Sequence, residues 1–248
     1  MIALDLARAL DPSRIAADVG LTLDPWQRDL MRSTAQRVLI LASRQVGKTT
    51  VTALIAVATA VLKGGALVLI LSPSQRQSGE MFRTVVRFLK ELDGAPNIAA
   101  ESTLRCELEN ASRICALPSS EATIRGFSAV DLIIVDEAAR VPDELFAAVR
   151  PMLATSGGRM IMLSTPAGRR GAFFEQWTDE NNDWHKVRVA ASDCPRISQE
   201  FLDSELRELG QKQFESEYGL IFHDADEAMF GTAAIEAAFT SEVQPLWQ

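Results

Sequence analysis

The chain has 248 residues and a formal net charge of −8, with 47% hydrophobic and 23% charged residues. This composition is typical of a globular protein with a buried core, and it excludes a disordered or fibrous chain. Apolar runs are only as long as strands, far short of the roughly 20 residues that span a bilayer, and the N-terminus lacks a signal-peptide pattern. We therefore expect a soluble intracellular protein.

Strand-like and helix-like segments alternate along the chain. Residues 1–20 have the pattern of an amphipathic helix followed by a turn, and Asp24-Pro25 marks the start of the next helix. After this point, short apolar runs indicate buried strands. The expected strands are Arg37–Leu41, Ala66–Leu71, Leu132–Val135, Arg159–Leu163 and Lys186–Ala190, with a hairpin of Leu104–Leu108 and Arg113–Leu117. The expected helices are Thr49–Leu62, Ser74–Leu92, Pro142–Leu153, Phe173–Trp177, Gln199–Leu209 and Gln211–Tyr218.

This alternation predicts an α/β fold with a mostly parallel central sheet and helices on both faces. We divide the chain into an N-terminal helix or arm (1–23), an α/β domain (24–223) and a C-terminal tail or linker (224–248). The three cysteines have no metal-binding spacing, so we expect reduced thiols in or near the core and no zinc site.

The segment between the first strand and the next helix has the most informative pattern. Residues 42–49 match the phosphate-binding pattern G-x-x-x-x-G-K-[ST], except that Ala42 replaces the first glycine. Gly47 lets backbone N–H groups close around a phosphate, Lys48 can neutralise the β- and γ-phosphates, and the Thr49 hydroxyl can ligate Mg²⁺. Thr50 either joins the site or only continues the helix. The predicted nucleotide-binding segment is Ser43, Arg44, Gln45, Val46, Gly47, Lys48, Thr49 and Thr50.

Two acidic residues follow the apolar strand 132–135, at the edge where open α/β sheets bind ligands. Asp136 is expected to hold Mg²⁺ through water, and Glu137 to polarise the attacking water as a general base. Taken alone, such a pair is often only a helix N-cap. Together with the phosphate loop, it predicts an enzyme in which Gly47–Thr49 and Asp136–Glu137 converge at adjacent strand tips around one magnesium–triphosphate.

Four further segments carry candidate residues, and each has an alternative interpretation. Arg44 can touch the γ-phosphate or form an ion pair that anchors the loop. Arg125 can act on a neighbouring subunit's nucleotide as an arginine finger, or it can be structural. Gln27 can pair with the edge of adenine, or it can be an ordinary polar residue of a helix. The segment Ser164-Thr165-Pro166 can sense the γ-phosphate, or it can form a plain turn.

Taken together in chain order, these segments resemble the ATPase domain of the large terminase subunit of tailed phages. The matching pieces are Trp26-Gln27, Ser43–Thr50, Arg125–Phe127, Val135–Ala139 and Ser164–Pro166, within roughly residues 24–220. The resemblance implies an additional-strand (ASCE) P-loop ATPase that uses ATP and Mg²⁺. It assigns phosphate and Mg²⁺ to the Lys48-Thr49 pair, Mg²⁺ to Asp136, catalysis to Glu137, adenine to Gln27 and coupling to Ser164–Pro166. It makes Arg44 and Arg125 candidates for stabilising the transition state, in cis and in trans.

The resemblance also implies a motor that drives double-stranded DNA into a procapsid. Its partners would be the portal protein, the small terminase subunit and further copies of the chain in a ring, usually a pentamer, with no membrane. It would act in the cytoplasm of the bacterial host, transiently at the portal. The net charge of −8 argues against static DNA binding but not against transient gripping by such a motor.

Large terminases normally continue into an RNase H-like nuclease domain, and we find no acidic strands of that kind after Phe230, so DNA cleavage is not expected from this chain. One alternative function is that of another P-loop DNA translocase, such as a helicase. A helicase normally carries a second RecA-like domain, and 248 residues leave no room for one. The other is a slow nucleotide-dependent assembly switch, which Glu137 and the arginines disfavour because they are groups for catalysis.

Overall fold

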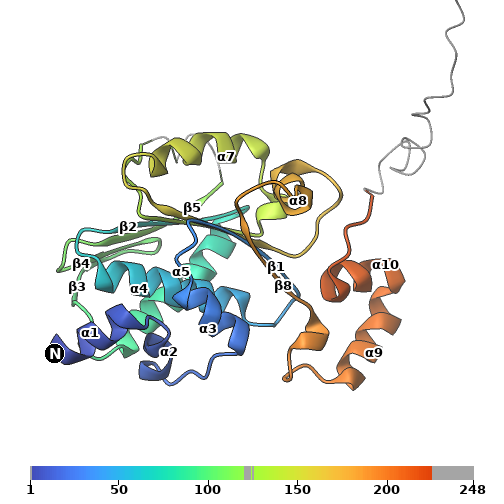
Figure 1. Ribbon diagram of the computed structural model, residues 1–248, viewed down its shortest axis with the longest axis horizontal. Coiled ribbons are helices and arrows are strands. Elements are labelled where there is room, and N and C mark those ends of the chain that lie inside the picture. Colours follow the sequence, from blue (N-terminus) through green and yellow to red (C-terminus); the bar gives the residue numbers. More distant parts are fainter. Residues whose placement is uncertain (1, 120–123, 125, 225–248) are drawn as a thin grey trace, which may run out of the picture.

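The computed structural model of the chain describes residues 2–119, 124 and 126–224 (Figure 1). Their strands form one eight-stranded sheet in the order β3-β4-β5-β2-β6-β7-β1-β8. The pairs among β5, β2, β6, β7, β1 and β8 are parallel, whereas β3 and β4 join antiparallel at one edge. The prediction of a mostly parallel α/β sheet is therefore confirmed.

The central strands are the continuous apolar runs of the sequence. They are β1 (Arg37–Ala42), β2 (Leu67–Ser72), β6 (Leu132–Asp136) and β7 (Arg159–Ser164), which are buried along nearly their whole length. Strands covered on both faces have no reason to alternate polar and apolar residues, which explains these runs. Towards the edges lie β5 (Arg113–Pro118), β8 (His185–Val189), β4 (Arg105–Leu108) and β3 (Ile98–Glu101).

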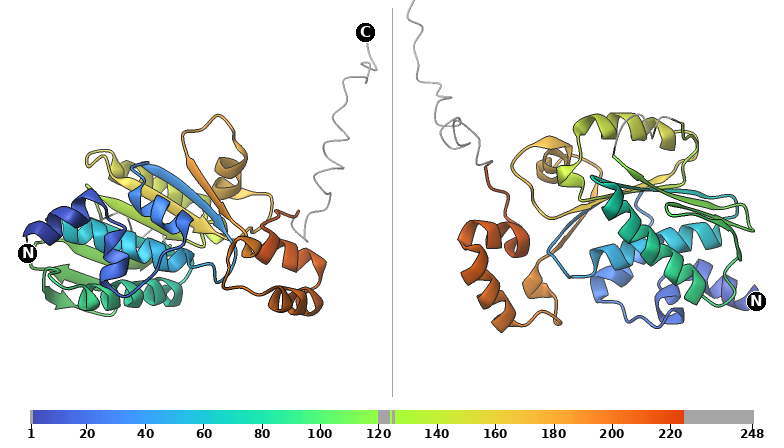
Figure 2. Two further views of the ribbon diagram at one scale, coloured as in Figure 1. Left: turned by 60° about the horizontal axis from the view of Figure 1, so that its bottom comes forward. Right: turned by 180° about the vertical axis from the view of Figure 1, so that it is seen from behind.

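Helices cover both faces of the sheet, as predicted (Figures 1 and 2). One face carries α4 (Lys48–Leu62) and α5 (Gln75–Glu91), with α1 (Ile2–Leu10), α2 (Arg14–Asp18) and α3 (Pro25–Arg32) around them. The other face carries α7 (Asp143–Val149), the 3₁₀ turn η2 (Arg150–Leu153) and α8 (Gly171–Thr178).

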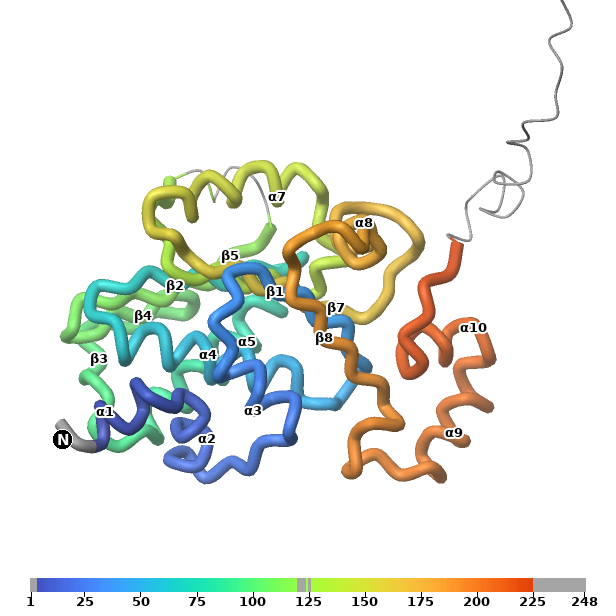
Figure 3. Tube along the Cα trace, in the orientation of Figure 1, coloured from blue at the N-terminus to red at the C-terminus, as the bar shows by residue number. Residues whose placement is uncertain are grey.

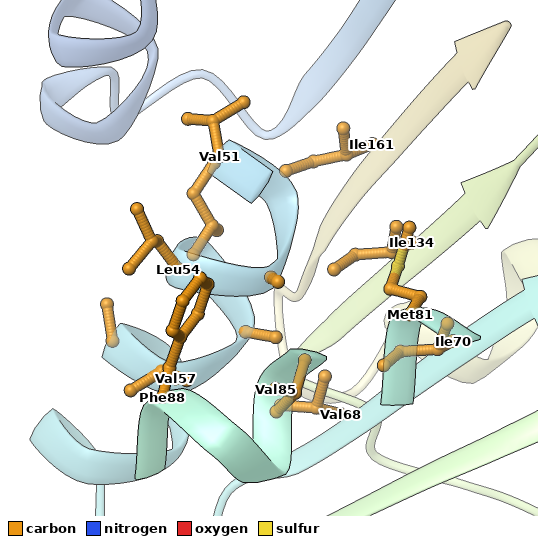
Figure 4. Packing of buried hydrophobic residues seen from close by; sticks show 14 of the residues in the cluster. Val51, Leu54, Val57, Val68, Ile70, Met81, Val85, Phe88, Ile134 and Ile161 are labelled. Atoms are coloured by element: carbon orange, nitrogen blue, oxygen red, sulfur yellow. The ribbon is translucent and has the colours of Figure 1, made fainter. Parts of the chain in front are cut away.

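Each face has its own apolar core. Between α4, α5 and the sheet, side chains such as Leu54, Phe88, Ile134 and Ile161 pack together with at most 1% exposure (Figure 4). A second cluster of buried residues lies under α7 and α8 on the opposite face. Because the sheet is fixed from both sides, the carboxyl ends of its strands form a rigid edge.

The N-terminal segment packs on this body. Ile15 of α2 is fully buried in the core around α4, and Arg8 of α1 is 1% exposed. The Arg8 guanidinium donates to the Asp18 carboxylate and to the Asp93 carbonyl, at 2.8 and 2.9 Å. These contacts tie the segment expected to be an arm to the core around α4 and to the turn after α5.

A helical segment follows the last strand at the side of the sheet (Figure 3). After the 3₁₀ turn η3 (Ala191–Asp193) come α9 (Gln199–Leu209), α10 (Gln211–Phe214) and η4 (Glu215–Gly219). We call residues 199–219 the C-terminal helical segment. Tyr218 packs there with Leu202, and its hydroxyl donates to Glu205 at 2.7 Å.

Three single elements differ in detail from the predictions. Strand β3 was not predicted, because its Ile98–Glu101 run is largely exposed and lacks an apolar pattern. The helix expected over 142–153 is α7 followed by η2, since Pro151 has no N–H for a continuing α-helix. The last expected helix, 211–218, is confirmed as helical, but it is one α-turn, α10, that continues as the π-helical turn η4.

The three cysteines are buried free thiols, as predicted. Within the described part of the chain, we find no helix that is both long and apolar enough to cross a membrane.

Candidate active site

The phosphate-loop segment has the strand–loop–helix form that the sequence predicts. β1 ends at Ala42 and α4 begins at Lys48. Within the loop, Gln45 and Gly47 have left-handed backbones, with φ of +60° and +90°. Such a conformation turns successive N–H groups towards one side, and the N-terminus of α4 adds its positive dipole end. The loop can therefore bind an anion through its backbone.

Gly47 is required by both space and conformation. A Cβ atom at this position would lie 2.5 Å from Nε2 of Gln27, and its φ of +90° is costly for any other residue. The close neighbour exists because Gln27 Nε2 donates to the Gly47 carbonyl at 3.2 Å. The glycine therefore lets α3 pack directly on the loop.

Gln27 and Arg196 support the loop from outside. Gln27, 4% exposed, also accepts the N–H of Asp24 at 2.9 Å, while Arg196 binds the Asp24 carboxylate at 2.6 and 2.8 Å. Arg196 further donates to the Val46 carbonyl at 3.4 Å. The structure thus places the Gln27 amide on protein groups, and its pairing with adenine stays a prediction.

Arg44 forms the anchoring ion pair, one of its two proposed roles. Its Nε and Nη2 atoms bind both carboxylate oxygens of Glu217 at 2.8 and 3.0 Å. These hydrogen bonds raise the pKa of the Arg44 guanidinium. Ser43 adds a bond from its hydroxyl to the Glu217 carbonyl at 2.9 Å. Glu217 therefore binds the C-terminal helical segment to the loop through both its side chain and its carbonyl.

Asp136 is a buried carboxyl at the tip of β6, with 8% exposure. Burial, helped by the charge of Glu137, raises its pKa from 3.8 to about 6. Lys48 and the N–H of Glu137, which donates to Asp136 at 3.0 Å, act in the opposite direction. A nearby divalent cation would offset the cost of burying this charge, so the position suits a metal ligand.

Glu137 meets the phosphate loop across the sheet edge. Its Oε1 atom lies 3.6 Å from Nζ of Lys48, which is 9% exposed. Glu137 has φ of +51°, a left-handed conformation that costs energy in a residue with a side chain. Such strain is retained where the surrounding contacts hold it, and here it turns the carboxylate towards Lys48.

The phosphate loop and the acidic pair approach each other as predicted, at Lys48 and Glu137, but the prediction of adjacent strand tips is wrong. In the observed order, β7 lies between β6 and β1. The alternation of strands and helices does not determine strand order, because a crossover can insert a later strand between two earlier ones. The long side chains of Lys48 and Glu137 span the intervening strand. This arrangement puts Ser164-Thr165-Pro166, at the tip of β7, between the loop and the acids.

The side chains at the tip of β7 are buried. Ser164 and Thr165 are 0% and 2% exposed. Among the described residues, none is a hydrogen-bond partner for the Ser164 hydroxyl, whereas the Thr165 hydroxyl accepts from Arg140 at 3.1 Å. Both residues are therefore fixed at the sheet edge, and the choice between a sensing role and a plain turn stays a prediction.

Two charged residues of the site were not predicted. Arg140 binds Glu137 at 2.6 Å, and its Nη2 lies 3.7 Å from Oε1 of Glu217. The three-residue spacing between Glu137 and Arg140 was the one usable signal. Glu217 has no local motif, and only the tertiary structure brings it to Arg44. Of the predicted residues, Arg125 lies outside the described part of the chain.

One protein family matches most of the chain. A family model described as "Terminase large subunit, T4likevirus-type, N-terminal" matches residues 39–237. Among curated proteins, none matches the sequence.

Solved structures with a similar fold include large terminases. The ATPase domain of the Thermus phage P74-26 large terminase has a TM-score of 0.71 and 22% identity, over 83% of this chain and 96% of that one. The large terminase of another thermophilic bacteriophage, in complex with ADP, gives 0.64 and 13%, over 84% and 53%. The HK97 bacteriophage large terminase gives 0.59 and 21%, over 84% and 49%. The chain thus spans about half the length of the latter two.

Proposed function

The chain belongs to the terminase large-subunit family, in the N-terminal region of its T4-like type, and from this premise we propose that it is an ATP-hydrolysing motor domain that translocates double-stranded DNA into a viral procapsid. The observation that carries the proposal is the approach of Lys48 and Glu137, at 3.6 Å, beside the buried carboxyl of Asp136. A cation, a base and a metal ligand beside an anion-binding loop are the groups that phosphoryl transfer needs.

The residues present fit ATP and Mg²⁺. The backbone of residues 43–47 and the α4 N-terminus would bind the phosphates, with Lys48 neutralising them, as the left-handed Gly47 permits. Thr49 and Asp136 would hold Mg²⁺. The bound ion would neutralise charge that develops on the phosphates. A large terminase from a thermophilic bacteriophage, which shares this fold, was solved with ADP and with ATP-γ-S, which supports nucleotide binding here.

In the proposed reaction, Glu137 accepts a proton from the attacking water. Its carboxylate faces Lys48, so a phosphate held by that lysine would lie on the side of the base. Arg125 would act on a neighbouring subunit's nucleotide, and Gln27 on adenine. Membership of the family supports a further proposal. Copies of the chain would form a ring, usually a pentamer, and this ring would work with the portal protein and the small subunit. Under this proposal the chain acts in the cytoplasm of the bacterial host.

The first prediction tests the base. Glu137→Gln should lower ATP turnover at least about 100-fold, because general-base catalysis typically contributes that much. The dissociation constant of a fluorescent ATP analogue should change less than about threefold, because the phosphate loop is intact. Turnover is measured with and without linear double-stranded DNA, and Glu144→Gln, an exposed acid on α7, is the matched control.

Normal hydrolysis by Glu137→Gln would show that the base is assigned wrongly. Wild-type turnover that DNA leaves unchanged, in a preparation containing procapsids and the small subunit, would contradict the coupling to translocation.

A further inference from the structure

Arg140 ends a short 3₁₀ turn that begins directly after Glu137. The turn is η1 (Ala138–Arg140), closed by the Arg140 N–H donating to the Glu137 carbonyl at 2.8 Å. Glu137 precedes this turn with a left-handed backbone, and its side chain meets that of Arg140 across the turn, with Oε2 and Nη1 2.6 Å apart.

The guanidinium joins residues from separate parts of the chain. Its Nη1 atom donates to Oε2 of Glu137 at 2.6 Å and to the hydroxyl of Thr165 at 3.1 Å. Thr165 is 2% exposed at the end of β7, so its hydroxyl has little freedom to move. Nη2 of the same guanidinium lies 3.7 Å from Oε1 of Glu217, so contacts on two nitrogens orient the planar group, unlike a lysine ammonium.

The two oxygens of Glu137 face different cations. Oε2 is bound by Arg140 at 2.6 Å, whereas Oε1 lies 3.6 Å from Lys48. When Lys48 serves a phosphate, Arg140 remains as the cation that holds Oε2. Oε1 then faces the phosphate and is the atom that can accept a proton from water.

We propose that Arg140 is a positioning residue: it fixes the Glu137 carboxylate against Thr165, so that one carboxylate oxygen is directed at the phosphate side of the site. The inference rests on the proposed ATP hydrolysis. The orientation of Glu137 would then depend on Thr165, which follows β7. The Arg140 side chain would thereby link ATP hydrolysis to the segment Ser164–Pro166.

The test separates positioning from binding. Arg140→Ala should lower kcat about 10- to 100-fold, while KM and the dissociation constant of a fluorescent ATP analogue change less than about threefold. Arg140→Lys should recover part of kcat, because an ammonium reaches Glu137 but cannot bridge as rigidly. Arg150→Ala, at an exposed arginine of η2, is the control for loss of an arginine nearby. Melting temperatures are recorded for every variant.

A double-mutant cycle tests the bridge. Thr165→Val should lower kcat, and adding it to Arg140→Ala should cause little further loss, because the pair acts as a unit. The inference is overturned if Arg140→Ala keeps or raises the wild-type kcat, if KM rises in proportion, or if the two losses multiply. Absence of turnover in the wild-type protein would instead contradict the proposed function itself.

Discussion

Among single residues, Asp136 carries a cost to stability that depends on pH. Its carboxyl is buried, and the folded-state pKa is raised from 3.8 to about 6. Because the folded protein binds the proton more tightly than the unfolded chain does, rising pH destabilises the fold. The loss of folding stability begins near pH 3.8, the pKa of Asp136 in the unfolded chain, and is complete above about pH 6–7. A ligand site has thus been kept at the expense of stability.

Asp136→Asn should therefore stabilise the nucleotide-free protein. In the presence of a metal chelator at pH 8, the free energy of unfolding should rise by roughly 1–3 kcal/mol, since one pKa unit corresponds to about 1.4 kcal/mol. Below about pH 4 the gain should vanish, because the aspartate is then protonated in both states. Chemical denaturation across pH measures it, with the exposed Asp203→Asn as control. A gain that is equal at pH 4 and pH 8 would show that charge burial is not its cause.

The residues that sequence reasoning found are those fixed by local pattern. Gly47 and Lys48 follow from the phosphate-loop spacing, and Asp136 and Glu137 from the end of an apolar strand. The partners that hold these residues follow from tertiary contacts. Arg44 binds Glu217 from the far end of the described chain, and no short-range pattern marks such a pair.

Among the elements, the C-terminal helical segment contacts the loop through Glu217 and packs elsewhere on its own apolar cluster. Glu217, 7% exposed, binds Arg44 with both oxygens, while the Arg44 side chain is 60% exposed. Removing the carboxylate should cost stability, but less than loss of a fully buried pair because water screens Arg44. We expect about 1–2 kcal/mol for Glu217→Ala.

The effect should be local. Hydrogen exchange of residues 199–219 should accelerate in Glu217→Ala, while β1, β6 and β7 keep their protection, because the core of the sheet does not involve this pair. Glu208→Ala, at an exposed acid of α9, is the matched control. Uniform acceleration over the whole sheet would contradict this division.

Element positions were predictable wherever burial on both faces left a continuous apolar run. The predicted strand Arg37–Leu41 is β1 (Arg37–Ala42), and Leu132–Val135 is β6 (Leu132–Asp136). Strand β3 and the order of the strands were not predictable. The first depends on pairing with β4 at an edge, and the second on crossover connections, and neither leaves a periodic pattern.

At the scale of the whole molecule, the site connects parts that pack separately. The phosphate loop precedes α4 in one core, β7 contributes Leu163 to that core and Met162 to the other, and Glu217 belongs to the C-terminal helical segment. A nucleotide bound at the loop would contact groups held by both faces of the sheet. Nucleotide binding should therefore stabilise the sheet, its helices and the C-terminal helical segment together.

Nucleotide should raise the melting temperature through this linkage. With Glu137→Gln to prevent turnover, Mg²⁺–ATP at about 100 times its dissociation constant should add about 2.7 kcal/mol. For a chain of this size, the melting temperature should rise by roughly 5–10 °C. Lys48→Ala, combined with Glu137→Gln, should lose most of the shift, because the triphosphate then lacks its buried cation. Differential scanning calorimetry measures both, and an equal shift in the double variant would place the nucleotide away from this loop.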